Sequence, residues 1–234
     1  MLMIRLLAVD MDGTCLNRKN QISEQNMAAL RRLAQSGIQI VPASGRACTC
    51  LPHQLRAAPL LFRYAITSNG ARVDDVRGHC LFCQEIYPDT ALSLLSDCQT
   101  LRIGVSAHIR REYLLQGRLL QMMGKAVYGK DAEQARCVPD LRPLIKQSRG
   151  VEELQFYFFS RTAREALRQI LSYYPTLNAA YSSSYVEIFS AEASKGKALS
   201  ALAQHLHLDR SQIACIGDSE NDLSMFEADG TPFA

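Results

Sequence analysis

The chain has 234 residues, 47% hydrophobic and 21% charged, a composition typical of a soluble globular protein with one large domain or two smaller ones. Its formal net charge of +3 excludes the basic stripe of a nucleic-acid binder, and no apolar stretch reaches membrane-spanning length. The first residues also lack a secretion signal, so we expect a cytoplasmic protein that binds neither nucleic acid nor membrane.

The first element predicted along the chain is a strand in the apolar run 4–9, buried on both faces as in a parallel sheet. Asp10 and Asp12 follow it directly, and Gly13 ends the strand. Carboxylates this close repel each other unless a positive group lies nearby. The pair therefore indicates either a loop with solvated acids or a site for a cation or a phosphate.

A βαβ unit is predicted next. Ser23 is a plausible N-cap for a helix that ends at Gly37, and a second apolar run, 38–43, ends in Ser44-Gly45-Arg46. This order predicts two parallel strands with a right-handed crossover. A third strand, 64–67, runs into Asn69-Gly70, a turn signal that predicts a hairpin with 71–73.

Two cysteine-rich stretches lie in this part of the chain, Cys48-Thr49-Cys50 with His53 and His79-Cys80-Leu81-Phe82-Cys83. They could supply a zinc site if they met in space, but Cys-x-Cys is poor spacing for a zinc finger. We expect reduced, partly buried thiols instead.

The pattern changes after about residue 85. A helix from Asp89 leads to shorter, more polar strands and a poorly periodic stretch, 116–143. A clear strand, 154–159, is followed by a capping box at Thr162 that opens a helix, and then by strand-like segments 177–181 and 185–189. We interpret residues 85–188 as an inserted α/β cap domain, with residues 1–84 and 189–234 forming the two parts of the core.

The first pattern resumes near residue 190. Lys195 lies where a helix begins, and a buried strand, 212–216, ends in Gly217-Asp218-Ser219-Glu220-Asn221-Asp222. Three buried strands thus end in polar residues, and ligands of an open parallel sheet bind beyond the carboxyl ends of its strands. Each residue alone has an ordinary explanation as a cap or turn former. Together they predict one site at one edge of a doubly wound sheet.

The chemistry of this set is specific. Several carboxylates without histidine or cysteine favour a hard cation such as Mg²⁺. A serine hydroxyl, backbone amides and a lysine at a helix start favour a phosphate. An aspartate held against phosphorus is a competent nucleophile, and a second acid two residues away can move the proton. A response-regulator receiver uses similar parts, but its acid pair is adjacent and its chain is about half as long.

The motifs resemble a known family. Asp10-Met11-Asp12-Gly13-Thr14, Ser44-Gly45-Arg46, Lys195-Gly196 and the segment 217–222 look like the four-motif signature of the haloacid dehalogenase superfamily. The insertion between the second and third motifs resembles its Cof-type (class IIB) branch, as does Ile66-Thr67-Ser68-Asn69-Gly70-Ala71. The resemblance covers nearly the whole chain and implies a Rossmann-like α/β core with a cap. Ser44 stands where threonine is more usual, which keeps the hydroxyl.

The resemblance implies a role for each site residue. Asp10 is the expected nucleophile and Asp12 the general acid/base, while Ser44, Gly45, Lys195 and Asn221 are expected to bind the phosphoryl group or substrate. Mg²⁺ is expected on Asp10, the Asp12 carbonyl group and Asp218, with support from Asn221 and Asp222.

The function expected from these roles is Mg²⁺-dependent hydrolysis of a small phosphorylated metabolite, such as a sugar phosphate or a phosphorylated cofactor, through an aspartyl-phosphate. Two alternatives stay open: a sugar phosphomutase or phosphotransferase with the same motifs, and a truncated, weakly active or inactive phosphate-binding protein. Members of this branch usually continue beyond a segment like Thr231-Pro232-Phe233-Ala234, so we expect a shortened chain of reduced stability, a monomer or a weak homodimer.

Overall fold

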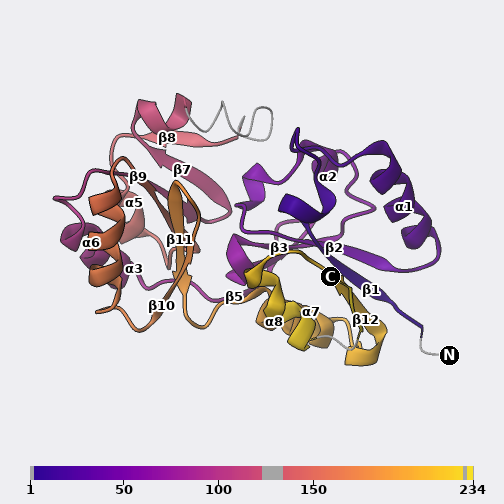
Figure 1. Cartoon of the computed structure of the whole chain (residues 1–234). Coiled ribbons are helices and arrows are strands. Elements are labelled where there is room, and N and C mark those ends of the chain that lie inside the picture. The colour runs from indigo at the N-terminus through magenta and orange to yellow at the C-terminus, as the bar shows by residue number, and fades with distance from the viewer. Residues whose placement is uncertain (1–2, 123–133, 229–230, 234) are drawn as a thin grey trace. The chain divides into compact units, whose positions relative to one another are not determined.

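The fold is described from a computed structural model, for residues 3–122, 134–228 and 231–233. The chain divides into two compact units, each of which is described by itself (Figure 1). The core unit consists of Met1–Arg46, Leu51–Cys83 and Ala193–Ala234, and the inserted unit consists of Ala47–Cys50 and Gln84–Glu192.

A seven-stranded sheet forms the centre of the core unit, with the strand order β13-β12-β1-β2-β3-β4-β5. Neighbouring strands from β13 to β3 pair in parallel, whereas β4 and β5 are antiparallel. The strands are β1 (Leu6–Asp10), β2 (Gln39–Ala43), β3 (Tyr64–Thr67), β4 (Arg72–Asp75), β5 (Cys80–Cys83), β12 (Ile213–Ile216) and β13 (Thr231–Phe233). The hairpin predicted from Asn69-Gly70 is confirmed, because Ile66 lies opposite Val73 in the β3–β4 pair.

Helices cover the core sheet because its central strand is apolar on both faces. All five residues of β1 are buried, and Leu6 and Ala8 pack with Leu199, Leu202 and Met225. The helices are α1 (Glu24–Gln35), α2 (His53–Arg56), α7 (Lys195–His205) and α8 (Leu223–Ala228), and Figure 1 shows α7 and α8 side by side next to β12. The predicted N-cap of α1 is confirmed, since the Ser23 side chain accepts a hydrogen bond from the Asn26 amide.

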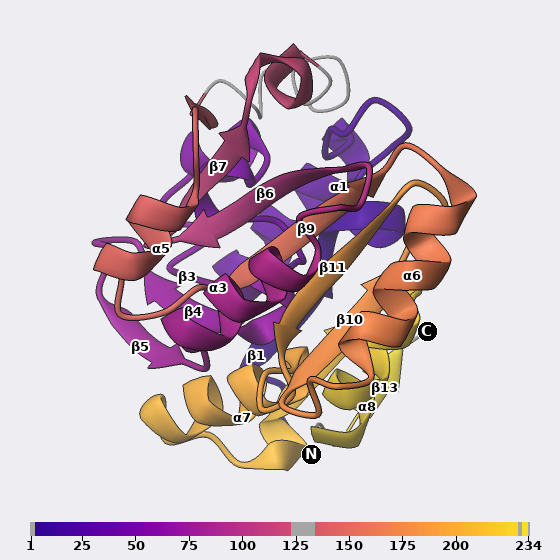
Figure 2. The ribbon, with the colours of Figure 1, turned by 90° about the vertical axis from the view of Figure 1, so that its left-hand side faces the viewer.

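The inserted unit is built on a six-stranded sheet with the order β10-β11-β9-β6-β7-β8. Figure 2 shows α3 and α6 on one face of this sheet. The strands are β6 (Ile103–Ile109), β7 (Glu112–Gln116), β8 (Arg136–Val138), β9 (Glu153–Phe158), β10 (Leu177–Tyr181) and β11 (Tyr185–Ser190), and the helices are α3 (Pro88–Asp97), α5 (Arg142–Gln147) and α6 (Arg161–Leu171). The poorly periodic stretch 116–143 contains β8 and the start of α5, and its residues 123–133 lie outside the described residues.

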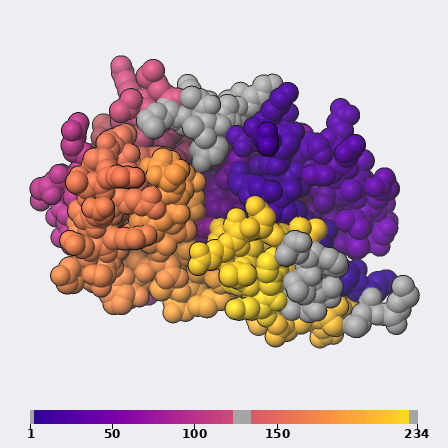
Figure 3. Space-filling view, in the orientation of Figure 1, coloured from indigo at the N-terminus to yellow at the C-terminus, as the bar shows by residue number. Residues whose placement is uncertain are grey.

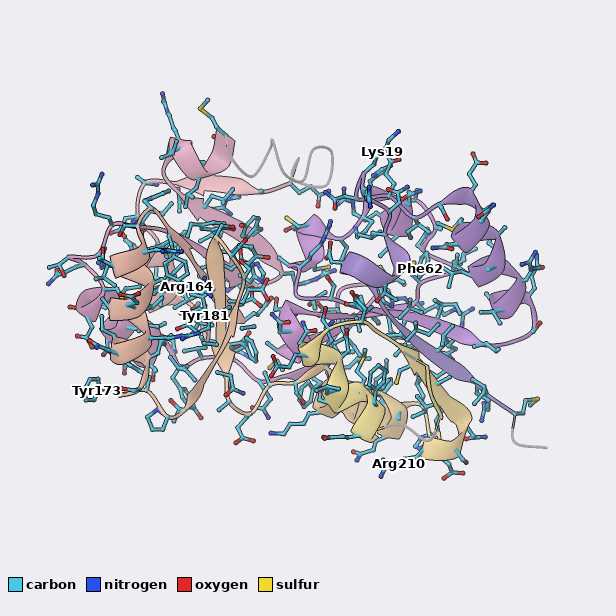
Figure 4. All side chains as sticks on the ribbon, in the orientation of Figure 1. Lys19, Phe62, Arg164, Tyr173, Tyr181 and Arg210 are labelled. Atoms are coloured by element: carbon cyan, nitrogen blue, oxygen red, sulfur yellow. The ribbon has the colours of Figure 1, made fainter. Side chains whose placement is uncertain are left out.

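The start of α6 corrects one sequence prediction. The capping box at Thr162 is wrong, because the helix begins at Arg161 and the Ser160 hydroxyl accepts the hydrogen bond from the Ala163 amide. In the space-filling view α6 and β10, in orange, lie at the surface of their unit (Figure 3). Figure 4 shows Arg164 of α6 beside Tyr181 of β10, with the guanidinium carbon 5.4 Å from the ring centroid.

The helices of both units are short and of mixed polarity. Among residues 3–122, 134–228 and 231–233, no helix is long and apolar enough to cross a membrane.

Candidate active site

Asp10 is the last residue of β1 and is buried, with 4% of its surface exposed. Its Oδ1 accepts a hydrogen bond of 2.6 Å from the Lys195 ammonium group. Its Oδ2 is also buried, and no described residue donates a hydrogen bond to it. A buried carboxylate oxygen without a donor is costly, so this atom is poised to interact with a ligand.

Lys195 reaches Asp10 from the first turn of α7. Ser194 caps this helix by accepting a hydrogen bond from the Lys197 amide, which fixes where the helix starts. The Lys195 side chain is 1% exposed, and its ammonium group also donates to Asp222 Oδ1 at 2.7 Å. One buried ammonium group is therefore shared between two carboxylates.

Asp218 and Asp222 follow β12. Asp222 is fully buried, and its Oδ2 accepts hydrogen bonds from the backbone amides of Asp218 and Ser219. Both Asp222 oxygens thus have donors. This carboxylate therefore holds Lys195 and the loop after β12 in place. Asp218 is exposed, and its Oδ1 accepts a hydrogen bond of 2.8 Å from the Thr14 hydroxyl.

The carboxylates form a set that fits a divalent cation. Asp10, Asp218 and Asp222 each offer an oxygen within 4.8 Å of the others. Three carboxylates and one ammonium group leave a charge of about −2, which a hard divalent cation would neutralise with the oxygen ligands it prefers. The Asp10 Oδ2 atom, which lacks a donor, adds a free ligand to this set. This group of acids can therefore hold a metal ion.

Asp12 is held by an arginine. Arg46, which is 6% exposed, donates from Nε to Asp12 Oδ2 at 2.8 Å and from Nη2 to Asp12 Oδ1 at 2.6 Å. The Asp12 side chain itself is half exposed. A bidentate contact of this kind fixes the plane of the carboxylate.

Ser44 and Gly45 directly follow β2. Ser44 is buried, and its hydroxyl accepts a hydrogen bond from the Arg46 amide at 3.1 Å, while Gly45 between them is half-buried. Asn221 donates from Nδ2 to Asn69 Oδ1 at 2.9 Å, and the Asn221 Oδ1 atom is buried without a donor among the described residues.

Burial and neighbouring charges shift the pKa values of Asp10 and Lys195 in opposite directions. Burial raises the pKa of Asp10 to about 6, although Lys195 lowers it, so the carboxylate is mostly ionised at neutral pH. Burial acts to lower the pKa of Lys195, but Asp10 and Asp222 outweigh it and raise the pKa overall. Lys195 therefore carries its charge.

Three residues that contact the predicted ones were not assigned to the site from the sequence. They are Thr14, Arg46 and Asn69. Arg46 directly follows Ser44-Gly45, and Asn69 lies just beyond β3, at the same edge of the sheet as the other strand ends. The rule that ligands bind beyond the carboxyl ends of parallel strands could have included both.

The cysteines take no part in the acidic set. All eight are free thiols, and they are Cys15, Cys48, Cys50, Cys80, Cys83, Cys98, Cys137 and Cys215. Among the described residues, the groups of three or more metal-ligating side chains contain no cysteine or histidine.

The sequence matches a known family along nearly its whole length. Residues 7–234 match the family model of the haloacid dehalogenase-like hydrolases. The chain is 25% identical to the 5-amino-6-(5-phospho-D-ribitylamino)uracil phosphatase YwtE of Bacillus subtilis, over 97% of this chain and 86% of that one.

Solved structures share the fold. A haloacid dehalogenase-like hydrolase from B. subtilis, 26% identical, superposes with a TM-score of 0.83 over 98% of this chain and 88% of its own. The subclass IIB sugar phosphatase BT4131, 16% identical, has the same fold, with a TM-score of 0.81 over 97% of this chain and 86% of its own. The chain therefore belongs to the haloacid dehalogenase-like hydrolases.

Proposed function

We propose that this protein is a Mg²⁺-dependent phosphomonoester hydrolase that acts on a small phosphorylated metabolite through an aspartyl-phosphate on Asp10. The observation that carries the proposal is the state of Asp10: a buried carboxylate, mostly ionised at neutral pH, with one oxygen on Lys195 and the other without a donor among the described residues.

In the first step, the free Asp10 oxygen forms a bond to phosphorus as the bond from phosphorus to the substrate oxygen breaks. Asp12 in its protonated form donates its proton to the leaving oxygen, and Arg46 keeps its carboxyl group in place. Lys195, which already donates to Asp10, and Ser44 would hold the phosphoryl oxygens.

In the second step, the ionised Asp12 removes a proton from water, and the water oxygen attacks phosphorus. The bond between phosphorus and Asp10 breaks, which releases phosphate and the free carboxylate. The residues that would hold Mg²⁺ are Asp10, Asp218 and the Asp12 carbonyl group, with Asp222 in support. Bound there, Mg²⁺ would offset the negative charge of the phosphoryl group.

The substrate class rests on the comparisons. YwtE, a relative along nearly the whole chain, is a phosphatase of a small phosphorylated metabolite, a phosphoribityl derivative of uracil. The net charge of +3 also suits an anionic small molecule.

The proposal is tested with a panel of phosphorylated metabolites in the presence of Mg²⁺, with release of inorganic phosphate as the measurement. At least one compound should be hydrolysed by the wild type, and Asp10→Asn should lose this activity while keeping its fold by circular dichroism. Asp12→Asn should slow both formation and breakdown of the acid-labile phosphoenzyme. Wild-type turnover by Asp10→Asn, with deamidation excluded by mass spectrometry, would end the proposal.

A further inference from the structure

A turn beside the candidate site adopts a costly backbone conformation. Ser68, Asn69 and Gly70 follow β3 and have φ values of 50°, 54° and 87°. Glycine enters this left-handed region at little cost, whereas Ser68 and Asn69 both carry a β-carbon, although asparagine tolerates the region better than most residues. The two are 0% and 2% exposed, so solvent does not stabilise the turn. Strain of this kind persists where surrounding contacts require it.

The first contacts of the turn are to the segment after β2. The Asn69 amide donates to the Ser44 carbonyl oxygen at 3.2 Å, and the Ser68 amide donates to the Arg46 carbonyl oxygen at 3.0 Å. These two bonds need successive amides to point toward Ser44 and Arg46, which the left-handed conformation provides. The turn therefore fixes the backbone on both sides of Gly45.

The second contact is to the start of α7. A β-carbon on Gly70 would lie 2.2 Å from the carbonyl carbon and oxygen of Ser194 and 2.5 Å from the Lys195 nitrogen. The backbone of the turn thus packs directly on the helix start that positions Lys195.

The third contact reaches the loop after β12. Asn69 Oδ1 accepts the 2.9 Å hydrogen bond from Asn221 Nδ2, across 152 residues of sequence. Because the Nδ2 end of the Asn221 amide group is bound to Asn69, the buried Oδ1 end has no hydrogen-bond donor among the described residues. An oxygen in this position can accept a hydrogen bond from a ligand or coordinate a hard cation.

We propose that Asn69 is a positioning residue of the phosphoryl site: through the Ser68–Gly70 turn it joins Ser44, Lys195 and Asn221, and its side chain orients the Asn221 amide group for the ligand. This inference rests on the proposed function, because it assigns Asn69 to the same site. It differs from a purely structural role, in which glycine, free of left-handed strain, would serve equally well at position 69.

The test is a double-mutant cycle of Asn69→Gly and Asn221→Ala, with kcat and KM on a hydrolysed phosphomonoester and calorimetric binding of inorganic phosphate in Mg²⁺. Asn69→Gly should change the thermal midpoint little, because relief of the left-handed strain offsets the lost hydrogen bond to Asn221, yet lower kcat/KM and phosphate affinity about tenfold, the effect of one buried hydrogen bond. When Asn221 is already alanine, Asn69→Gly should lower kcat/KM and phosphate affinity by less than about a further twofold, because the two residues act as a unit.

The control is His207→Gly, which removes another left-handed side chain (φ 52°) just after α7. It should keep or raise the thermal midpoint, because it relieves similar strain, and leave kcat/KM and phosphate affinity unchanged. Additive effects of the two cycle mutations, or wild-type phosphate affinity in Asn69→Gly, would overturn the inference. If the wild type hydrolyses nothing in the panel, the proposed function fails, and the phosphate-binding cycle still decides the role of Asn69.

Discussion

Two lysines in the first turn of α7 differ strongly in burial. Lys195 is 1% exposed between Asp10 and Asp222, whereas Lys197 is exposed. Lys195→Ala would leave two buried carboxylates uncompensated, so we expect a loss of about 3–5 kcal/mol of stability without Mg²⁺. We also expect kcat/KM to fall about 10²–10³-fold.

Lys197→Ala is the matched control, because an exposed substitution usually changes stability by less than about 0.5 kcal/mol. Chemical denaturation and steady-state kinetics on both variants measure the difference. The opposite ranking would show that the phosphoryl group is held elsewhere.

Arg46 holds Asp12 by two hydrogen bonds from Nε and Nη2. Lysine cannot reproduce this fork, so Arg46→Lys should keep the charge but free the carboxyl group of Asp12. We expect kcat to fall up to about 10²-fold, since misplacing a catalytic group by about 1 Å has that effect. Arg31→Lys, on the exposed face of α1, is the control. Unchanged kcat in Arg46→Lys would mean that Asp12 needs no such support.

At the scale of single elements, the sequence predicted the strand ends better than the contacts around them. Asp10, Ser44 and Asp218 were predicted because each follows a buried apolar run, a local pattern. The pairing of Asn69 with Asn221 joins segments 152 residues apart, and no local pattern encodes it.

The same limit explains the wrong start of α6. Ser160 and Thr162 are both good N-cap residues. Which of them caps α6 depends on where β9 ends, and that is set by tertiary packing. The assignment of Ala47–Cys50 to the inserted unit is likewise tertiary, since Tyr113 and Leu115 pack against Ala47 and Cys50.

The packing of α7 on α8 depends on a glycine. A β-carbon on Gly196 would lie 1.9 Å from the Ser224 carbonyl oxygen, so alanine there must separate the helices. Gly196→Ala should lower stability by about 3 kcal/mol, the upper range for overpacking. Gly37→Ala meets nothing within 4 Å and has only its φ of 87° to oppose it, so about 1–2 kcal/mol is expected. Calorimetric midpoints compare the two, and equal losses would contradict the close approach of the helices.

The buried side chain of His108, in β6, makes the stability of the fold depend on pH. Burial lowers its pKa to about 3, from an ordinary value of 6.5. Above pH 6.5 the residue is neutral in both the folded and the unfolded chain. As the pH falls toward 3 only the unfolded chain takes up the proton, so stability is lost by about 1.4 kcal/mol per pH unit. Between pH 6.5 and pH 5 this amounts to about 2 kcal/mol.

The measurement is the free energy of unfolding at pH 6.5 and pH 5. His108→Gln should lose the part of the pH dependence that this residue contributes, whereas His207→Gln, exposed after α7, should keep it. If His108→Gln has the same pH dependence as the wild type, Glu153, whose Oε1 lies 3.6 Å from the His108 Nδ1 atom, keeps the imidazole protonated in the fold.

At the scale of the whole molecule, the sequence predicted a mixed α/β architecture with an insertion because its two patterns differ along the chain. The parallel strands β1, β2 and β12 of the core unit are almost entirely buried and produce apolar runs. The strands of the inserted unit are antiparallel apart from the β7–β8 pair, and their pattern is weaker. Which metabolite is bound depends on individual side chains, and no periodicity specifies these.

The charge of the candidate metal site links cation binding to the stability of the whole chain. Without a cation, the carboxylates of Asp10, Asp218 and Asp222 lie close together, and the Lys195 ammonium group pairs with only Asp10 and Asp222. The folded state is therefore destabilised by repulsion among these carboxylates. A cation that binds only the folded protein stabilises it by RT ln(1 + [L]/Kd), about 2.7 kcal/mol at 100 times Kd. Mg²⁺ should therefore raise the thermal midpoint with a logarithmic dependence on its concentration.

Asp218→Asn tests whether this stabilisation comes from the proposed site. The change removes one charge and one strong ligand from an exposed position, so the variant should fold and lose most of the Mg²⁺-induced rise. Its midpoint without Mg²⁺ should equal or exceed that of the wild type, because less repulsion remains. Glu220→Gln removes the same charge two residues away, outside the acidic group, and should keep the full rise. An equal rise in Asp218→Asn and Glu220→Gln would place the stabilising cation elsewhere on the protein.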